Sequence, residues 1–232
     1  NQTSPNSRDW LLLIGGSTYK FTLTGFYLVA LVAILKNHGY SLNQLSWIHL
    51  IGGIEAAKVL FAALMEQRPA GRFGRFRGWL LAATLGLSAV FGLMACTDIT
   101  QNFPLLLVCC VLLSAMSAVY GCAMLGLSCI VLPHRERGFG GVIQTMAARG
   151  GKMIGGALVL WLYQEYGQTA AAGLMLAFSL LMLLQLLYYR DPESPTAQGS
   201  WTALATRLVS FWQQPETGWR WLVLLFAVAA PY

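Results

Sequence analysis

Residues 134–160, HRERGFGGVIQTMAARGGKMIGGALVL, constrain the fold of this chain more than any other stretch. The stretch begins with charged residues and continues as an apolar segment that carries seven glycines and two cations, Arg149 and Lys152. Each glycine inside a helix in water costs about 1 kcal/mol relative to alanine, so a water-soluble helix of this sequence would be unstable. Between membrane helices, glycine allows the backbones to approach closely. The stretch therefore predicts a tightly packed membrane helix.

Two stripes on this predicted helix follow the three- and four-residue spacing of an α-helix. The first has the small-xxx-small pattern of close helix contacts in membranes and consists of Gln144, Ala148, Gly151 and Gly155. The second is polar and consists of Thr145, Arg149, Lys152 and Gly156. A cation that faces lipid costs a few kcal/mol, so we expect Arg149 and Lys152 to face protein or a water-filled cavity.

The rest of the chain also favours a membrane protein, because 56% of its residues are hydrophobic and only 10% are charged. A soluble domain has about 25% charged residues. Six apolar segments approach or exceed the roughly 20 residues that cross a bilayer, at residues 10–35, 42–65, 78–97, 104–132, 138–163 and 169–189. We therefore predict an all-α membrane protein with a six-helix transmembrane bundle at residues 10–189.

Three segments flank this predicted bundle. Residues 1–9 form a polar tail, residues 190–218 a polar linker, and residues 219–232 the truncated start of a seventh transmembrane helix. The linker has apolar residues on one helical face, which favours a helix in the membrane interface or, equally, a loop helix packed on the end of the bundle. That face consists of Trp201, Leu204, Leu208 and Phe211.

The basic residues outside the six segments predict the orientation in the membrane. If the segments alternate in direction, only Lys36 lies on one side and ten arginines lie on the other, which predicts a cytoplasmic N-terminus. These are Arg8, Arg68, Arg72, Arg75, Arg77, Arg135, Arg137, Arg190, Arg207 and Arg220. The net charge of +6 thus reflects membrane topology, and we expect no nucleic-acid partner.

Ionisable residues inside a membrane are candidates for function. Glu55 is the only carboxylate well inside an apolar segment, and Lys58 lies one turn further on. A nearby cation opposes the effect of burial on such a carboxyl group. Glu55 is therefore a candidate proton carrier, and the alternative is a static pair in which Glu55 and Lys58 neutralise each other.

The apolar segments contain three further cations, Lys20, Arg149 and Lys152, so their positive charge exceeds the negative charge of the single carboxylate inside them. An anionic substrate with a carboxylate or phenolate group would balance this charge, although one or more cations can instead reach the membrane interface. Tyr27, Gln144 and His49 are candidate cavity-lining residues, although a lone histidine more often serves packing. The chain has no hydrolase, phosphate-loop or metal-ligand motif, so we expect no enzyme activity, cofactor or metal site.

Several motifs resemble those of a known transporter family, the major facilitator superfamily. Between the second and third segments, Glu66, Arg68, Gly71 and Arg72 approximate the acid–base–glycine–base loop of that superfamily. A more specific pattern is similar to the branch that contains the muropeptide permeases of the AmpG type and the rhizobactin/pyochelin siderophore permeases. It comprises Glu136-Arg137-Gly138, Gly140-Gly141, Gln144, Arg149-Gly150 and Gly155-Gly156, with Tyr27-Leu28-Val29, Gly39-Tyr40-Ser41 and Gln44-Leu45.

This resemblance implies the N-terminal half of a facilitator fold, an inner-membrane location, a gating role for the loop and import of a bulky polar ligand. We expect two inverted three-helix repeats. Our main interpretation is import of an iron–siderophore complex by alternating access, driven by the proton gradient. The alternatives are a permease for muropeptides or other amphiphilic anions, and a non-transporting membrane subunit or scaffold. Transport requires a C-terminal half or a second chain to complete the cavity.

Overall fold

The structure is a computed structural model that describes residues 6–41, 45–46, 61, 65, 76–97, 103–133 and 136–189. Within these ranges the regular elements are all helical. They are α1 (Ser7–Gly25), η1 (Phe26–Ala30), α2 (Leu31–Asn37), α5 (Arg77–Cys96), α6 (Phe103–Val131), α7 (Arg137–Met153), η4 (Ile154–Leu158) and α8 (Val159–Tyr188). Almost all of the predicted second segment, the linker and the start of the seventh helix lie outside the described residues.

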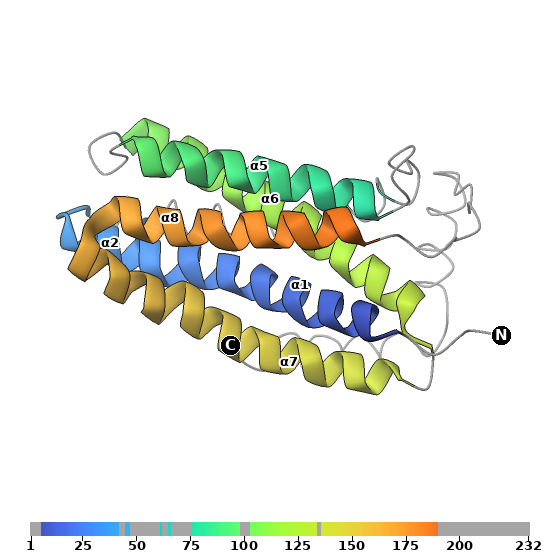
Figure 1. The fold of residues 1–232 in the computed structure, drawn as a ribbon. Coiled ribbons are helices and arrows are strands. Elements are labelled where there is room, and N and C mark those ends of the chain that lie inside the picture. The colour runs from blue at the N-terminus through green and yellow to red at the C-terminus, as the bar shows by residue number, and fades with distance from the viewer. Residues whose placement is uncertain are drawn as a thin grey trace, which may run out of the picture. The chain divides into compact units, whose positions relative to one another are not determined.

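The helices form an elongated bundle in which α1, α5 and α7 run in one direction (Figure 1). Helix α6 and the longer part of α8 run in the opposite direction (Figure 1). Among the described residues, four helices are long and apolar enough to cross a membrane: Ser7–Asn37, Arg77–Cys96, Pro104–Val131 and Gly138–Tyr188. The all-helical class is therefore confirmed, and the count of six transmembrane helices stays a prediction.

The first membrane-spanning stretch is continuous from α1 through the π-helical segment η1 to α2. It begins three residues before the predicted Trp10, because Asn6 and Asp9 form a capping box: the Asp9 backbone N–H donates to the Asn6 side chain, and Asn6 N donates to Asp9 Oδ2 at 2.9 Å. Asn6 Oδ1 also accepts a hydrogen bond from Ser7 N at 2.9 Å. It ends at Asn37, and Gly39 follows two residues later with a φ of +83°, the left-handed conformation that is typical just after a helix end.

The last stretch reverses direction at one residue. The sequence predicts a turn over residues 164–168, but only Gly167, with φ of +82° and ψ of −175°, departs from helical geometry inside α8. Glycine adopts this φ without a steric penalty. The side chain of Gln168 then donates from Nε2 to the carbonyls of Met94 and Thr97, each at 2.9 Å, and so holds the end of α5 against α8.

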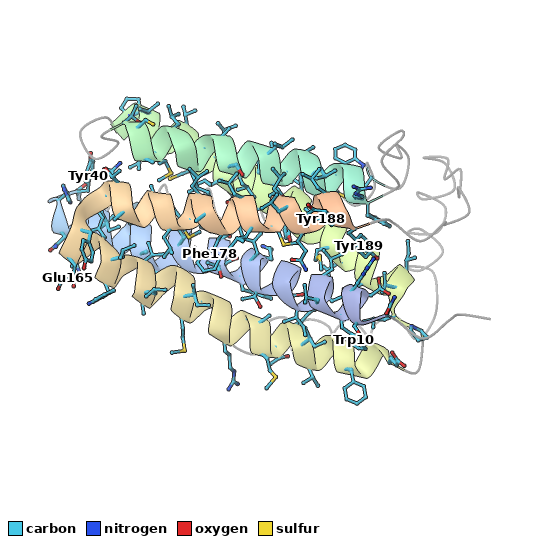
Figure 2. The ribbon with its side chains drawn as sticks, viewed as in Figure 1. Trp10, Tyr40, Glu165, Phe178, Tyr188 and Tyr189 are labelled. Atoms are coloured by element: carbon cyan, nitrogen blue, oxygen red, sulfur yellow. The ribbon has the colours of Figure 1, made fainter. Side chains whose placement is uncertain are left out.

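Several large aromatic side chains lie toward the two ends of the bundle. Trp10, Tyr188 and Tyr189 lie toward one end, and Tyr40 lies with Glu165 toward the other (Figure 2). Tryptophan and tyrosine are typical of the two interfaces between a membrane and water. At the first of these ends, Arg77 donates from Nε to Leu186 O at 2.9 Å and from Nη2 to Leu187 O at 2.7 Å, which satisfies the last carbonyls of α8.

Candidate substrate-binding site

Lys20 occupies the interior of the bundle near the middle of the first membrane-spanning stretch. Its side chain is 8% exposed, and Nζ donates to Ser117 Oγ of α6 at 3.3 Å. The lysine stem fits because α6 has a glycine opposite it: a Cβ atom placed on Gly121 would lie 2.7 Å from Lys20 Cε. Lys20 is therefore enclosed by protein, and its contact with a substrate stays a prediction.

Buried hydroxyl groups surround this region of α1. Tyr19 and Ser179 of α8 form a hydrogen bond of 2.6 Å, and Ser179 Oγ also bonds to Met175 O at 2.9 Å. The rings of Tyr19 and Tyr120 meet edge to face, with centroids 5.3 Å apart. Tyr120 donates to Gly16 O at 3.4 Å. Helices α1, α6 and α8 thus build a polar centre within an apolar bundle.

The contact between α1 and α7 brings the glycine-rich stretch next to this centre. A Cβ on Gly151 would lie 2.7 Å from Thr18 O and 2.9 Å from Thr22 N, and a Cβ on Gly155 would collide with Thr22 O. The hydroxyls of these threonines bond within α1, to Ile14 O and Thr18 O, each at 2.8 Å. The predicted role of Gly151 and Gly155 in close packing is confirmed.

The residues of the polar stripe differ in how exposed they are. Lys152 is half-buried, and its backbone contacts the position of Gly25 in α1, whereas the side chain of Arg149 is exposed. Gly151 lies two positions after Arg149, which places the two residues about 160° apart around the helix. Arg149 therefore lies on the face of α7 turned away from α1. Our expectations that it faces protein or a water-filled cavity and that it contacts a substrate stay predictions.

The other candidate residues have varied positions. Tyr27 is buried, 5% exposed, and Gln144 is half-buried. The remaining candidates lie outside the described residues, and their roles stay predictions: His49, Glu55, Lys58, Glu66, Arg68, Gly71 and Arg72. Sequence reasoning missed Ser117, Tyr120 and Ser179, although hydroxyl residues in long apolar segments were a signal that could have identified them.

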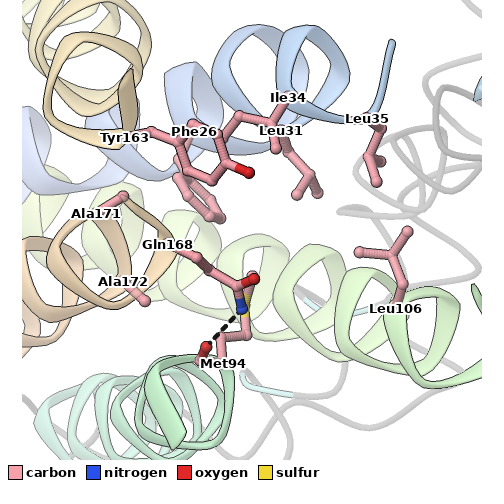
Figure 3. A pocket seen from close by; sticks show the side chains of 10 residues that line it. All are labelled: Phe26, Leu31, Ile34, Leu35, Met94, Leu106, Tyr163, Gln168, Ala171 and Ala172. Carbon is pink, nitrogen blue, oxygen red and sulfur yellow. Dashed lines mark hydrogen bonds between the residues drawn. The ribbon is translucent and has the colours of Figure 1, made fainter. Parts of the chain in front are cut away.

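A small cavity near the turn at Gly167 has a volume of about 20 Å³ and an almost wholly apolar wall formed by η1, α2, α5, α6 and α8 (Figure 3). The buried Oε1 of Gln168 has no hydrogen-bond partner among the described residues. This volume holds about one water molecule, so the cavity is too small for a transported substrate. Within the part of the chain that the structure describes, no group of three His, Cys, Asp or Glu residues could hold a metal ion.

Comparisons with known proteins agree with the helical architecture. The chain is 26% identical over 227 residues to anhydromuropeptide permeases of Escherichia coli K12 and Escherichia coli O157:H7. The alignment covers 97% of this chain and 45% of each permease, so the chain spans about half the length of these relatives. Residues 12–232 match the Major Facilitator Superfamily. Because the match extends over nearly the whole sequence, this chain belongs to the Major Facilitator Superfamily.

Proposed function

We propose that this chain forms part of a permease that carries muropeptides, or chemically similar amphiphilic anions, across the bacterial inner membrane by alternating access. The similarity to two anhydromuropeptide permeases over 97% of the chain supports this substrate class. Neither relative is named as a siderophore permease, so our main interpretation from the sequence, iron–siderophore import, has no specific support. The muropeptide alternative is the better supported of the two.

The observation that carries the proposal is the buried cation in α1. Lys20 is 8% exposed and lies beside hydroxyl groups rather than at a membrane interface. Charged residues within membrane segments are costly and mark substrate or ion pathways. The peptide of a muropeptide carries carboxylate groups, and an ammonium group in the interior provides the positive charge that attracts them. Lys20 is therefore our first candidate for substrate recognition.

Arg149 belongs to a second part of the proposed site. Its side chain is on the exposed face of α7, opposite the contact with α1. We propose that a C-terminal half or a second chain covers this face, so that Arg149 faces a cavity between the two parts. Lys152, half-buried next to α1, would then lie at the edge of that cavity.

The experiment compares uptake of labelled anhydromuropeptide and labelled iron–siderophore in cells that lack the gene, with and without the full-length gene restored. We expect the gene to restore uptake of anhydromuropeptide and to leave siderophore uptake unchanged. If the gene restores only siderophore uptake, iron–siderophore import becomes the better supported function. If neither uptake depends on the gene, the proposal of transport fails.

Glu55 is the proposed proton carrier, with the basic-loop residues Arg68 and Arg72 on the cytoplasmic side. Glu55→Gln removes a titratable group, so we expect uptake to lose its dependence on external pH. Initial uptake rates measured across a pH series test this prediction. Glu165→Gln is a matched control, because Glu165 is an exposed carboxylate at the turn between α7 and the main part of α8. An unchanged pH profile in Glu55→Gln would leave the static pair with Lys58 as the explanation.

A further inference from the structure

A second cavity lies at the end of the bundle, away from Lys20. It has a volume of about 530 Å³ and lies between the start of α1 and the end of α8. Its wall consists of Ser7, Arg8, Leu11, Leu12, Gln185, Tyr188 and Tyr189. A cavity of this size can hold a ligand group of ordinary small-molecule dimensions. Arg8 and Lys20 are separated by twelve residues, or about 18 Å along the helix, so this cavity is distinct from the proposed substrate site.

The polar side chains of this wall are able to donate hydrogen bonds. Arg8 carries a permanent positive charge, and among the described residues that line the cavity there is no carboxylate. The adjacent Asp9 accepts a hydrogen bond from Asn6 N at 2.9 Å in the capping box. Gln185 lies against Gly15 of α1, and its buried Nε2 has no hydrogen-bond partner among the described residues. The wall is therefore positively charged and rich in donors, which favours an anionic ligand.

The same cavity also has an apolar side that continues along the helix. Leu11 is 63% exposed and lies three residues after Arg8, so both residues share one face of α1. Tyr188 is 85% exposed, and it lies with Trp10 and Tyr189 toward this end of the bundle (Figure 2). A cation at the end of a membrane helix, followed by exposed leucine and bordered by tyrosine, matches the distribution of charge and hydrocarbon in a lipid.

We propose that this cavity binds an anionic phospholipid. The headgroup phosphate would contact the guanidinium of Arg8, which recognises phosphate with two parallel hydrogen bonds. The acyl chain would lie along the exposed side of Leu11, within the bilayer. Basic pockets between transmembrane helices bind anionic headgroups in this way. The ligand is a component of the membrane and differs from the transported substrate.

The test uses the full-length protein, purified, delipidated and titrated with phosphatidylglycerol or with phosphatidylcholine that has identical acyl chains. Native mass spectrometry measures the bound lipid. We expect phosphatidylglycerol to bind more tightly than phosphatidylcholine, and Arg8→Gln to weaken it by about fivefold, the effect of one cation near an anionic lipid. The matched control is Lys36→Gln, which removes an exposed cation from α2, outside this cavity, and should leave binding unchanged.

Two further measurements distinguish a membrane lipid from a soluble anion as the ligand. Inorganic phosphate at millimolar concentration should fail to displace phosphatidylglycerol, and Leu11→Ser should weaken both lipids, because the acyl chain contributes to binding. Displacement by phosphate would contradict a lipid site and indicate a soluble anion. Equal binding of the two lipids, or an Arg8→Gln variant with unchanged affinity, would overturn the proposal.

Discussion

The contact between α1 and α7 differs from the contact between α5 and α8 in the atoms that meet across it. Between α1 and α7, glycines lie against backbone: Gly151 and Gly155 face the peptide groups of α1, and Gly25 faces the backbone of Lys152. Between α5 and α8, side chains reach across to the partner helix: Gln168 donates to Met94 O, and Arg77 donates to Leu186 O and Leu187 O. On each of these helices, buried side chains also recur at three- and four-residue spacing: Leu80, Ala83, Leu87, Phe91 and Met94 in α5, and Ala171, Met175, Ser179, Met182 and Leu186 in α8.

This difference predicts how each contact responds to substitution. A backbone atom cannot move aside without distorting its helix, whereas the end of a flexible side chain can change rotamer. The α1–α7 contact continues into two π-helical segments, η1 and η4, of which η4 contains Gly155. These segments lie next to each other where Gly156 approaches Val29. Such segments occur often at functional sites. We therefore expect the α1–α7 contact to tolerate added side-chain atoms less well than the α5–α8 contact does.

The largest effect should come from Gly155→Ala. The new Cβ would collide with Thr22 O, so α1 and α7 must separate, and we expect the free energy of unfolding to fall by about 3 kcal/mol or more. Thermal unfolding of the full-length protein in detergent measures this loss. The control is Gly173→Ala in α8, where a Cβ would meet no atom within 4 Å and stability should not fall. Equal stability of the two variants would refute the backbone contact.

An intermediate effect should follow from Gln168→Leu, which removes both hydrogen bonds to Met94 O and Thr97 O. We expect a loss of about 2 kcal/mol, because each bond contributes about 1 kcal/mol. Hydrogen exchange should show faster opening of the last turn of α5, and the control Gln164→Leu changes an exposed glutamine at the same turn. If the end of α5 exchanges at the same rate in both variants, Gln168 does not hold the two helices together.

The smallest effect should come from Gly86→Ala in α5. Its new Cβ would lie 3.0 Å from Met116 Sδ, the flexible end of a side chain in α6. Methionine adapts to changes in its surroundings, so we expect the unfolding free energy to change by less than about 1 kcal/mol. The same thermal measurement applies. A loss as large as that of Gly155→Ala would show that side-chain contacts in this bundle tolerate an added methyl group as poorly as backbone contacts do.

The sequence predicted the features that depend on spacing within one helix. The three- and four-residue pattern identified Gly151 and Gly155 as contact residues, and the apolar lengths located α5 and α6 to within one residue of their expected starts. The pattern did not predict the exposure of Arg149, because periodicity shows which residues share a face but not which neighbour that face meets. The sequence also did not predict most of the hydrogen-bond partners in the polar centre, because they lie far apart in the chain. Tyr19 and Ser179, for example, are 160 residues apart.

The most direct test of the central claim is the concentration dependence of anhydromuropeptide uptake in cells that express the full-length Lys20→Met variant. Methionine keeps the length and apolar stem of lysine and removes its charge. After normalisation to the amount of protein in the membrane, we expect the KM for uptake to rise at least about tenfold, the effect of losing one charged contact of about 1.4 kcal/mol or more. The control Lys36→Met, at an exposed position in α2, should retain the normal KM. Normal KM and normal maximal rate in Lys20→Met would contradict the claim that this buried cation serves an anionic substrate.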